Sequence, residues 1–453
     1  MHVLPNTLYS LNTVLSHNDK GLAVKQTTPP SSVKLFDPAT LIEPYDAYEI
    51  LRSEVPVAFI EELNIHVVTR YDLLREAIRD TKTYSSKFDG FLNESRRIAF
   101  ESATPEVRGK LLELQAEMVE LPPTMLTLDE PEHTKYRSLV SKLFTNAQIK
   151  NAEPNVQAVI DEKIANFSAA NTAHSVEFVS AFAGSVPLTI IADRLGIPAE
   201  SRAFFDDAAT AAASELRLTP LPGEEMIRRA QLAVDLQKLC IELIEARRRE
   251  PRDDMITILA NSKLEDENRY LTHGECISVL NQFLVAGHET TASAFSWGML
   301  LLCQNPELQT QLTDNPALTR TFVEEVLRLE SPVQGLPRLV TQDTELGGYP
   351  LKAGSLIMLR YGAANRDEQQ FERPNEVNLE RSKAGSQLAF GAGVHFCVGA
   401  PLARQELTLG FPALLRLAHD YELDPGHPPP MAEASFILRN LPELHIRWNQ
   451  SSR

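Results

Sequence analysis

The segment from Phe390 to Gly399 most restricts how this chain can fold, because it holds one cysteine in a glycine-rich loop directly before an amphipathic run. Gly391 and Gly393 lie in the same loop, and glycine permits tight turns and a close approach to a flat, bulky group. Backbone amides in such a loop, and at a helix N-terminus, can donate hydrogen bonds to sulfur. The pattern therefore predicts that Cys397 is kept as a thiolate, a good axial ligand for haem iron.

A lone cysteine near glycines is more often a small buried apolar residue, so the spacing of its neighbours has to decide. The order Phe-Gly-x-Gly-x-His-x-Cys-x-Gly, read from Phe390 to Gly399, resembles the haem-thiolate signature of cytochromes P450. The resemblance implies haem b as the cofactor and Cys397 as the ligand of its iron. It also implies that Phe390 lies over the thiolate, that His395 contacts a haem propionate, and that Gly391 shapes the loop.

A second motif lies in segment 316–331, which is predicted to be a helix because proline begins it and a further proline follows it. Its apolar stripe leaves Glu325 half-buried, with Arg328 close enough to pair with it. Most Glu-x-x-Arg pairs are exposed ion pairs that contribute little. In the P450 family, however, such a pair precedes the cysteine and is completed by another arginine. The resemblance implies a structural triad of Glu325, Arg328 and Arg381.

A long apolar run from Thr272 to Gln304 predicts a helix that crosses the whole protein. Thr272 and Glu275 match a capping box, and a rise of 1.5 Å per residue makes such a helix roughly 45 Å long. Polar residues such as Asn281 and His288 interrupt every window that is long enough to span a membrane. The run is therefore predicted to be a core helix.

The centre of this helix reads Ala286-Gly287-His288-Glu289-Thr290, which is unfavourable helix chemistry. Ala286 and Thr290 share one face, which leaves space beside a hydroxyl for a diatomic molecule. A packing defect is the alternative. In the P450 family this position holds the acid and alcohol of dioxygen activation. The resemblance implies that Glu289 and Thr290 deliver protons and that Ala286 lies against the haem.

Segment 128–137 holds two further donors at helical spacing. An acidic cap and Pro131 are predicted to begin a helix, on which His133 and Arg137 lie on one face. The resemblance implies that both bind haem propionates and that Arg338 is a third such donor. For each residue alone, a solvated surface charge is the alternative.

The matches run in the family's order from about residue 36 to residue 446. They imply a mainly α protein with small β-sheets, namely the cytochrome P450 fold with a long central helix over the haem. A small β region is expected around residues 56–69. We expect residues 34–453 to form a single P450 domain, and the polar residues 1–33 to form a flexible N-terminal extension. No signal peptide or membrane anchor is recognisable, so a soluble, cytoplasmic protein of the bacterial type is expected.

Composition and family resemblance together restrict the partners. A net charge of −17 argues against nucleic acid, and four cysteines without paired spacing argue against a disulfide framework. The resemblance implies a monomeric monooxygenase that uses dioxygen and takes electrons from NAD(P)H through a separate ferredoxin and ferredoxin reductase. Lys135, Lys142 and Arg404 are candidates for the basic patch that binds the ferredoxin. A gas sensor or electron carrier, and a peroxide-driven peroxygenase, are the alternatives; the acid and alcohol argue against them.

A largely apolar substrate pocket is expected beside the distal helix, formed by residues on that helix and by three other segments of the family pattern. Gln282 or Gln334 is expected to bind one oxygen function of a neutral terpenoid, steroid, fatty-acyl or aromatic substrate. Arg96 and Arg97 leave a carboxylate-bearing ligand as the alternative. The expected pocket residues are Phe88, Phe91, Met125, Gln282, Val285, Val333, Gln334, Leu336, Phe436 and Ile437.

Overall fold

The computed structural model describes residues 29–30, 33–169, 175–213, 221–264 and 267–449. Most of the expected N-terminal extension, residues 1–33, therefore lies outside the described residues. Helices dominate, and the strands form one larger sheet and several small ones, so the prediction of a mainly α fold with small β-sheets is confirmed.

The helices are α1 (Pro38–Ile42), α2 (Tyr45–Glu54), α3 (Tyr71–Arg79), α4 (Asp89–Ser102), α5 (Pro105–Glu117), α6 (Glu132–Ser141), α7 (Asn146–Ala169), α8 (Ser185–Leu195), α9 (Arg202–Ala213), α10 (Gly223–Arg249), α11 (Met255–Asn261), α12 (His273–Gln304), α13 (Pro306–Asp314), α14 (Thr319–Glu330), α15 (Tyr361–Ala364) and α16 (Ala400–Leu417). The strands are β1 (Val57–Ile60), β2 (Ile65–Val68), β3 (Tyr84–Ser85), β4 (Ser175–Glu177), β5 (Lys263–Leu264), β6 (Arg269–Tyr270), β7 (Gly335–Val340), β8 (Thr344–Leu346), β9 (Tyr349–Leu351), β10 (Leu356–Arg360), β11 (Glu422–Leu423) and β12 (His445–Arg447).

The larger sheet has the strand order β1-β2-β10-β7-β3 and includes both strands of the expected β region around residues 56–69. β2 and β10 are parallel, and the other neighbours are antiparallel. Side chains alternate across a strand. Ile357 therefore joins the apolar cluster that includes Leu74 of α3, whereas Met358 joins the cluster that includes Leu51 of α2. Both faces of the sheet are thus covered.

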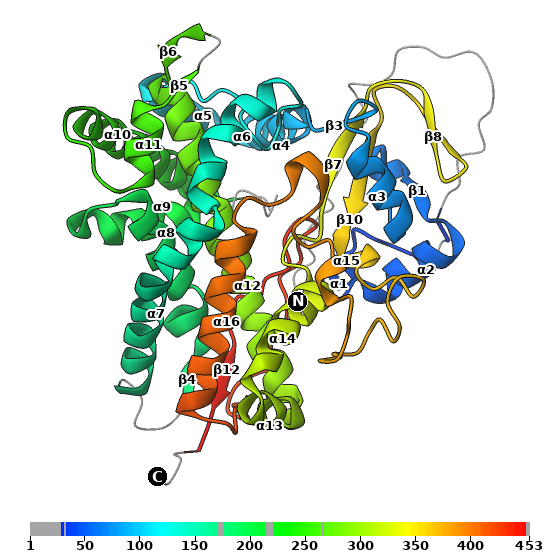
Figure 1. The fold of residues 1–453 in the computed structure, drawn as a ribbon. Helices are drawn as coiled ribbons and strands as arrows, with labels where there is room; N and C mark the ends of the chain where they lie inside the picture. The colour runs from blue at the N-terminus through cyan, green and yellow to red at the C-terminus, as the bar shows by residue number, and fades with distance from the viewer. Residues whose placement is uncertain (1–28, 31–32, 170–174, 214–220, 265–266, 450–453) are drawn as a thin grey trace.

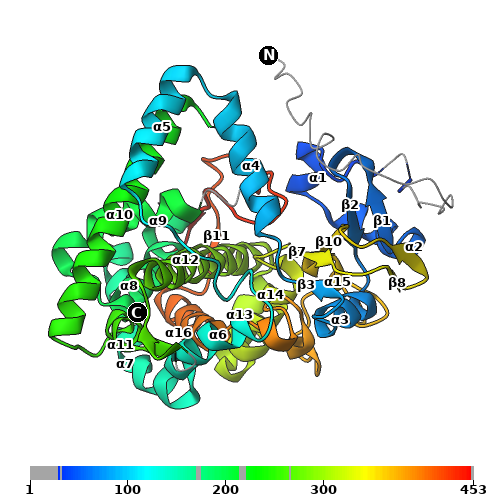
Figure 2. The ribbon, with the colours of Figure 1, turned by 90° about the horizontal axis from the view of Figure 1, so that it is seen from above.

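α12 runs through the middle of the molecule, with helices α7 to α11 on one side and the sheet on the other (Figures 1 and 2). Its N-terminus has the predicted capping box: Thr272 Oγ1 accepts from the Glu275 amide at 3.2 Å, and the Glu275 carboxylate accepts from the Thr272 amide at 2.7 Å. Every residue from 291 to 300 is buried, as a core helix requires. Among the described residues, no helix is both long enough and apolar enough to cross a membrane.

α16 packs very closely on α12, and two glycines permit this contact. A Cβ atom at Gly298 of α12 would overlap the ring of Phe411, and one at Gly410 of α16 would overlap the ring of Phe295. Glycine at both positions lets the two helices approach each other until the rings lie against the opposite backbone. Because α16 begins at Ala400, this contact also holds the cysteine loop that precedes it.

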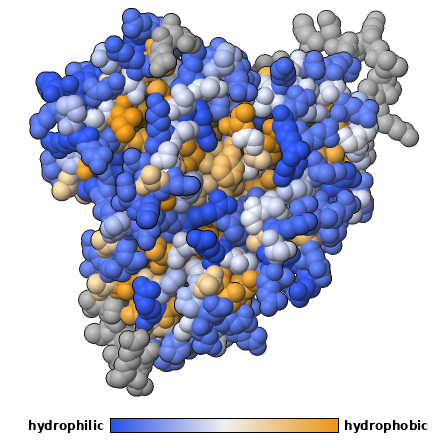
Figure 3. Space-filling view, viewed as in Figure 1, coloured by the Kyte–Doolittle hydropathy of each residue, from blue (hydrophilic) through white to orange (hydrophobic). Residues whose placement is uncertain are grey.

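On the face of the molecule that Figure 3 shows, apolar side chains gather near the middle, between the helical part and the sheet.

Candidate haem and dioxygen site

The loop from Phe390 to Gly399 turns where its glycines permit it. Gly391 has φ 65° and Gly393 has φ 67°, values that other residues rarely adopt. Gly399 has an ordinary φ of −79° and is the N-cap of α16. The Cys397 amide donates to the carbonyl of Phe390 at 2.9 Å, which closes the loop around the sulfur.

The surroundings of Cys397 suit a thiolate that is bound to a metal. Burial raises the pKa of the Cys397 thiol, while the backbone amides of Gly399 and Ala400 and the guanidinium of Arg137 act in the opposite direction. These groups donate to the sulfur or carry positive charge beside it. A coordinated metal cation deprotonates a thiol outright, so the donors would then stabilise the bound form.

Two histidines and an arginine lie together beside this loop. The ring centroids of His133 and His395 are 4.3 Å apart, and Arg137 Nη2 donates to the carbonyl of Phe396 at 2.6 Å. His395 Nε2 lies 2.9 Å from the hydroxyl of Ser86. Both ring nitrogens of His133 are buried and have no hydrogen-bond partner among the described residues. A buried imidazole needs such a partner, so a bound acceptor would fit here.

This cluster carries more positive charge than its own acids balance. Burial and the neighbouring Arg338 and His133 lower the pKa of His395 to about 3. The side chain of Arg338 is itself buried, in β7. Asp129 acts in the other direction, but its carboxylate already accepts from the amide of Ser86 at 2.8 Å. The cluster therefore fits an additional anionic group, and a haem carries two propionates.

The start of α6 differs from the prediction. Pro131 is the N-cap and has no side-chain capping bond, because the Asp129 carboxylate turns away to accept from Ser85 Oγ at 2.5 Å. An interaction with a distant segment has replaced the local cap. His133 and Arg137 still lie in α6 with the predicted spacing, because the helix begins at Glu132.

The middle of α12 presents a small, accessible surface within an otherwise buried helix. Ala286 is exposed, although Leu284 and His288 beside it are buried. Thr290 Oγ1 donates to the carbonyl of Ala286 at 2.7 Å, as the helical spacing predicts. A flat group could lie against Ala286 with the Thr290 hydroxyl at its side. Glu289 points elsewhere: it is buried, and its Oε2 accepts from Asn440 Nδ2 at 2.7 Å.

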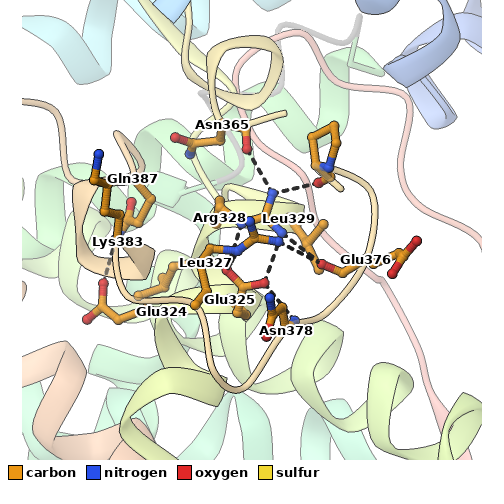
Figure 4. Close-up of polar contacts among 12 residues, drawn as sticks. Glu324, Glu325, Leu327, Arg328, Leu329, Asn365, Glu376, Asn378, Lys383 and Gln387 are labelled. Carbon is orange, nitrogen blue, oxygen red and sulfur yellow. Dashed lines mark hydrogen bonds and ion pairs between the residues drawn. The ribbon is translucent and has the colours of Figure 1, made fainter. Parts of the chain in front are cut away.

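Glu325 and Arg328 are fully buried in α14 and form a bidentate ion pair, with Nε–Oε1 2.7 Å and Nη2–Oε2 3.0 Å (Figure 4). Arg381 Nε donates to the same Oε1 at 2.9 Å. Burial lowers the pKa of Arg328, and the Glu325 carboxylate opposes this. The structure thus brings together the three residues that the sequence assigns to a triad.

The remaining donors of Arg328 are also used. They bond to the carbonyls of Asn365, Pro374 and Glu376, all in the segment that covers α14 (Figure 4). This cover explains why Glu325 is fully buried, whereas the helical stripe alone predicts half-burial. The predicted start of the helix also changes, because Pro316–Leu318 form a 3-10 turn before α14.

Arg404 is not a free member of a basic docking patch. Its Nε and Nη2 bond to the carboxylate of Glu324 at 2.5 and 3.0 Å, and its Cζ lies 4.5 Å from the centroid of the Phe390 ring. Arg404 therefore links α16 to α14 and covers Phe390. Of the three cations expected to bind a ferredoxin, Lys142 at the end of α6 is exposed, and Lys135 is partly buried.

The expected pocket residues come together in two groups. Gln282 of α12 bonds to Thr124, which is adjacent to the buried Met125. In the second group, the backbone amide of Gln334 donates to the carbonyl of Ile437 at 2.7 Å, and Val333 forms a β-bridge with the residue that follows Ile437. Phe88 is buried at the start of α4, whereas Val285 and Leu336 are partly buried.

Two of the expected pocket side chains are used in other contacts. Both hydrogens of the Gln334 side-chain amide go to the carbonyls of Glu330 and Ser331 at 3.0 and 2.9 Å, and its Oε1 accepts from the hydroxyl of Tyr48 at 3.3 Å. These carbonyls are left over where α14 ends and need a donor. Phe436 packs on Phe36 at a centroid distance of 4.5 Å, in the apolar cluster under the sheet.

Two other residues that were expected near the substrate are Phe91 and Arg96. Their side chains lie outside the described part of the structure. The sequence also missed Asn440 as the partner of Glu289 and Ser86 as the partner of His395, because nothing in the local pattern marks either residue.

Sequence comparisons relate this chain to one protein family over most of its length. The family model described as Cytochrome P450 matches residues 114–447. Cytochrome P450 109 of Bacillus spizizenii is 32% identical over 391 residues, which cover 84% of this chain and 87% of that protein. The Vitamin D(3) 25-hydroxylase of Pseudonocardia autotrophica is 30% identical, covering 94% of this chain and 99% of that protein.

Solved structures show the same likeness in three dimensions. Cytochrome P450 CYP109Q5 from Chondromyces apiculatus aligns with a TM-score of 0.78 at 27% identity, covering 92% of this chain and 98% of that one. CYP109E1 from Bacillus megaterium, in complex with corticosterone, aligns with a TM-score of 0.77 at 27% identity, covering 91% and 100%.

Proposed function

Because this chain belongs to the cytochrome P450 family of haem monooxygenases, we propose that it uses dioxygen to hydroxylate a mainly apolar small organic substrate. One observation supports this most: Ala286 is accessible beside the Thr290 hydroxyl, in the middle of a helix that is mostly buried. A gas sensor or an electron carrier has no need of an alcohol and an acid at this place. The electrons come from NAD(P)H through a separate ferredoxin and ferredoxin reductase.

The family's haem b supplies the binding and reductive activation of dioxygen. We assign Cys397 as the ligand of its iron, since the Gly399 and Ala400 amides act on the sulfur. His133, Arg137, Arg338 and His395 hold the propionates. The unpartnered nitrogens of His133 and the positive charge around His395 support this assignment. Gly391 shapes the loop, and Ala286 would lie against the macrocycle.

Thr290 and Glu289 are the residues that we assign to proton delivery. The Thr290 hydroxyl donates its own hydrogen to the Ala286 carbonyl at 2.7 Å, so its oxygen remains free to accept. It can therefore hold a proton donor, such as a water molecule, at a defined position beside Ala286. Glu289 precedes it in the chain, and its buried carboxylate can exchange a proton with such a chain of donors.

The Thr290→Ala variant is expected to bind haem and substrate nearly as the wild type does, but to form roughly tenfold less product per NAD(P)H consumed. Without the hydroxyl, the proton donor is no longer held at a defined position. The reducing equivalents are then released as hydrogen peroxide. Product, peroxide and NAD(P)H are measured together in the reconstituted system. Thr189→Ala is a matched control, because Thr189 donates to the carbonyl of Ser185 at 2.8 Å in the neighbouring helix α8. Wild-type coupling in Thr290→Ala would contradict the assignment.

A neutral, mainly apolar substrate of terpenoid, steroid, fatty-acyl or aromatic type is the class that we propose. Val285, Val333, Leu336 and Ile437 support an apolar lining. Gln282 remains the candidate to orient one oxygen function, although its amide already bonds to Thr124. Among the similar proteins, CYP109E1 has been solved with corticosterone and with testosterone, and another relative is a vitamin D(3) 25-hydroxylase.

Titration of the ferric protein with matched ligands tests this substrate class. Testosterone and corticosterone are expected to give the high-spin shift of the Soret band, because they displace water from the iron and bury apolar surface. Their sulfate or glucuronide conjugates are expected to bind far more weakly. Imidazole is the control that reports access to the iron. If only strongly polar or multiply charged compounds give the shift, the proposed class is wrong.

A further inference from the structure

We propose that Asn440 is a positioning residue that holds the carboxylate of Glu289 in one orientation for proton delivery. The proposal rests on the proposed function of Glu289 and adds a residue that lies 151 positions further along the chain. Asn440 Nδ2 donates to Glu289 Oε2 at 2.7 Å. Only 9% of Asn440 and 8% of Glu289 is exposed, so water competes little with this hydrogen bond.

The backbone beside Asn440 is attached to the same face of α12 that carries Glu289. The carbonyl of Arg439 accepts from Ser293 Oγ at 2.5 Å and from Trp297 Nε1 at 3.0 Å. Glu289, Ser293 and Trp297 follow one another at intervals of four residues, so they lie along one stripe of the helix. Three successive contacts on this stripe thus bind segment 439–440 to the helix.

The side chain of Arg439 fixes the same segment from the other direction. Its Nε donates to Glu330 Oε2 at 2.7 Å, and its Nη1 donates to the carbonyl of Ile42 at 2.8 Å. Its Cζ lies 4.3 Å from the centroid of the Trp297 ring. The backbone that presents Asn440 is therefore preorganised, and the amide can hold the carboxylate without further ordering.

This arrangement holds the Glu289 carboxylate at one position throughout turnover. An amide hydrogen bond restricts the rotamer of the Glu289 carboxylate and fixes the direction of its Oε2 atom. Asn440 Oδ1 is buried and accepts no hydrogen bond from the described residues, so it can accept from one further donor beside Glu289. Asn440 itself transfers no proton, because a side-chain amide does not ionise near neutral pH. Its effect is on the position of the Glu289 carboxylate.

The first measurement is infrared spectroscopy of the ferric resting protein. The carboxylate band of Glu289 is identified as the difference between the wild type and Glu289→Gln. Asn440→Leu and Asn440→Ala both remove the donor, and each is expected to shift or remove this band. The Glu289→Gln background lacks this carboxylate. In it, the same substitutions are expected to leave this spectral region unchanged. An unshifted band in both single variants would overturn the proposal.

The second measurement is turnover. Asn440→Leu is expected to lower kcat about tenfold, the effect of losing one hydrogen bond to a charged group, and to leave KM within about twofold. The solvent deuterium isotope effect on kcat is expected to rise, because proton delivery becomes slower. Asn305→Leu is the matched control, since Asn305 donates to the carbonyl of Leu301 at the far end of the same helix. A change in KM alone, with kcat retained, would indicate a merely structural role and overturn the proposal.

The two levels of inference fail separately. If Glu289→Gln turns over like the wild type, the proposed role of Glu289 in proton delivery is wrong. If Glu289→Gln is slow but the infrared band is the same with and without Asn440, the role of Glu289 stands and that of Asn440 is wrong.

Discussion

Replacing Cys397 with serine is expected to abolish the red-shifted Soret band of the ferrous carbonyl complex and to reduce monooxygenase activity below detection. A hydroxyl does not supply the electron density that a thiolate supplies to the iron. The Gly399 and Ala400 amides, which act on the sulfur in the wild type, cannot compensate for this loss. Haem binding itself is expected to persist, because the His133, Arg137, Arg338 and His395 donors remain. The measurement is the carbonyl difference spectrum of purified protein.

Cys303→Ser is the matched control for this experiment. Cys303 is a partly buried free cysteine near the end of α12, and its substitution is expected to leave the spectrum unchanged. Proteins are compared at equal haem content, so that a loss of haem is not mistaken for a change of ligand. A Cys397→Ser protein that keeps the red-shifted band would refute the assignment of the ligand.

The features that the sequence predicts well are those carried by local spacing. The capping box at Thr272, the position of α12 and the turns of the cysteine loop depend on residues within a few positions of one another. The bond from Thr290 to Ala286 follows from the helical repeat alone. The Glu-x-x-Arg pair is local as well, and only Arg381 had to be supplied by the family resemblance.

The features that it could not predict are contacts between distant segments. Asn440 lies 151 residues from Glu289, and no pattern in either segment marks their hydrogen bond. The side-chain amide of Gln334 has partners of a similar kind, because it donates to the carbonyls at the end of α14. The acidic cap predicted for the helix at Pro131 is absent for the same reason, since Asp129 accepts from Ser85 instead. In each case a polar side chain is used by a tertiary partner that the local sequence does not reveal.

The second large effect is expected at the buried triad. Arg328→Leu and Glu325→Ala are each expected to lower the free energy of unfolding by about 3–5 kcal/mol. Glu325→Ala leaves two buried guanidinium groups without their carboxylate, and Arg328→Leu leaves the buried Glu325 carboxylate with Arg381 as its only cationic partner among the described residues. Arg328→Leu also deprives the carbonyls of Asn365 and Pro374 of their side-chain donor, and it leaves the carbonyl of Glu376 with Arg381 alone. Arg328→Lys keeps the charge but loses the planar fork, so most of the loss is expected to remain.

An exposed pair with the same spacing provides the control. Lys110 and Glu113 of α5 are also three residues apart, at 2.9 Å, but their side chains are 49% and 70% exposed. Lys110→Ala is therefore expected to change the free energy of unfolding by less than about 1 kcal/mol. Urea unfolding of the haem-loaded proteins, followed by circular dichroism and by the Soret band, compares the variants. Equal losses in Lys110→Ala and Arg328→Leu would mean that the triad does not hold α14 to the segment that covers it.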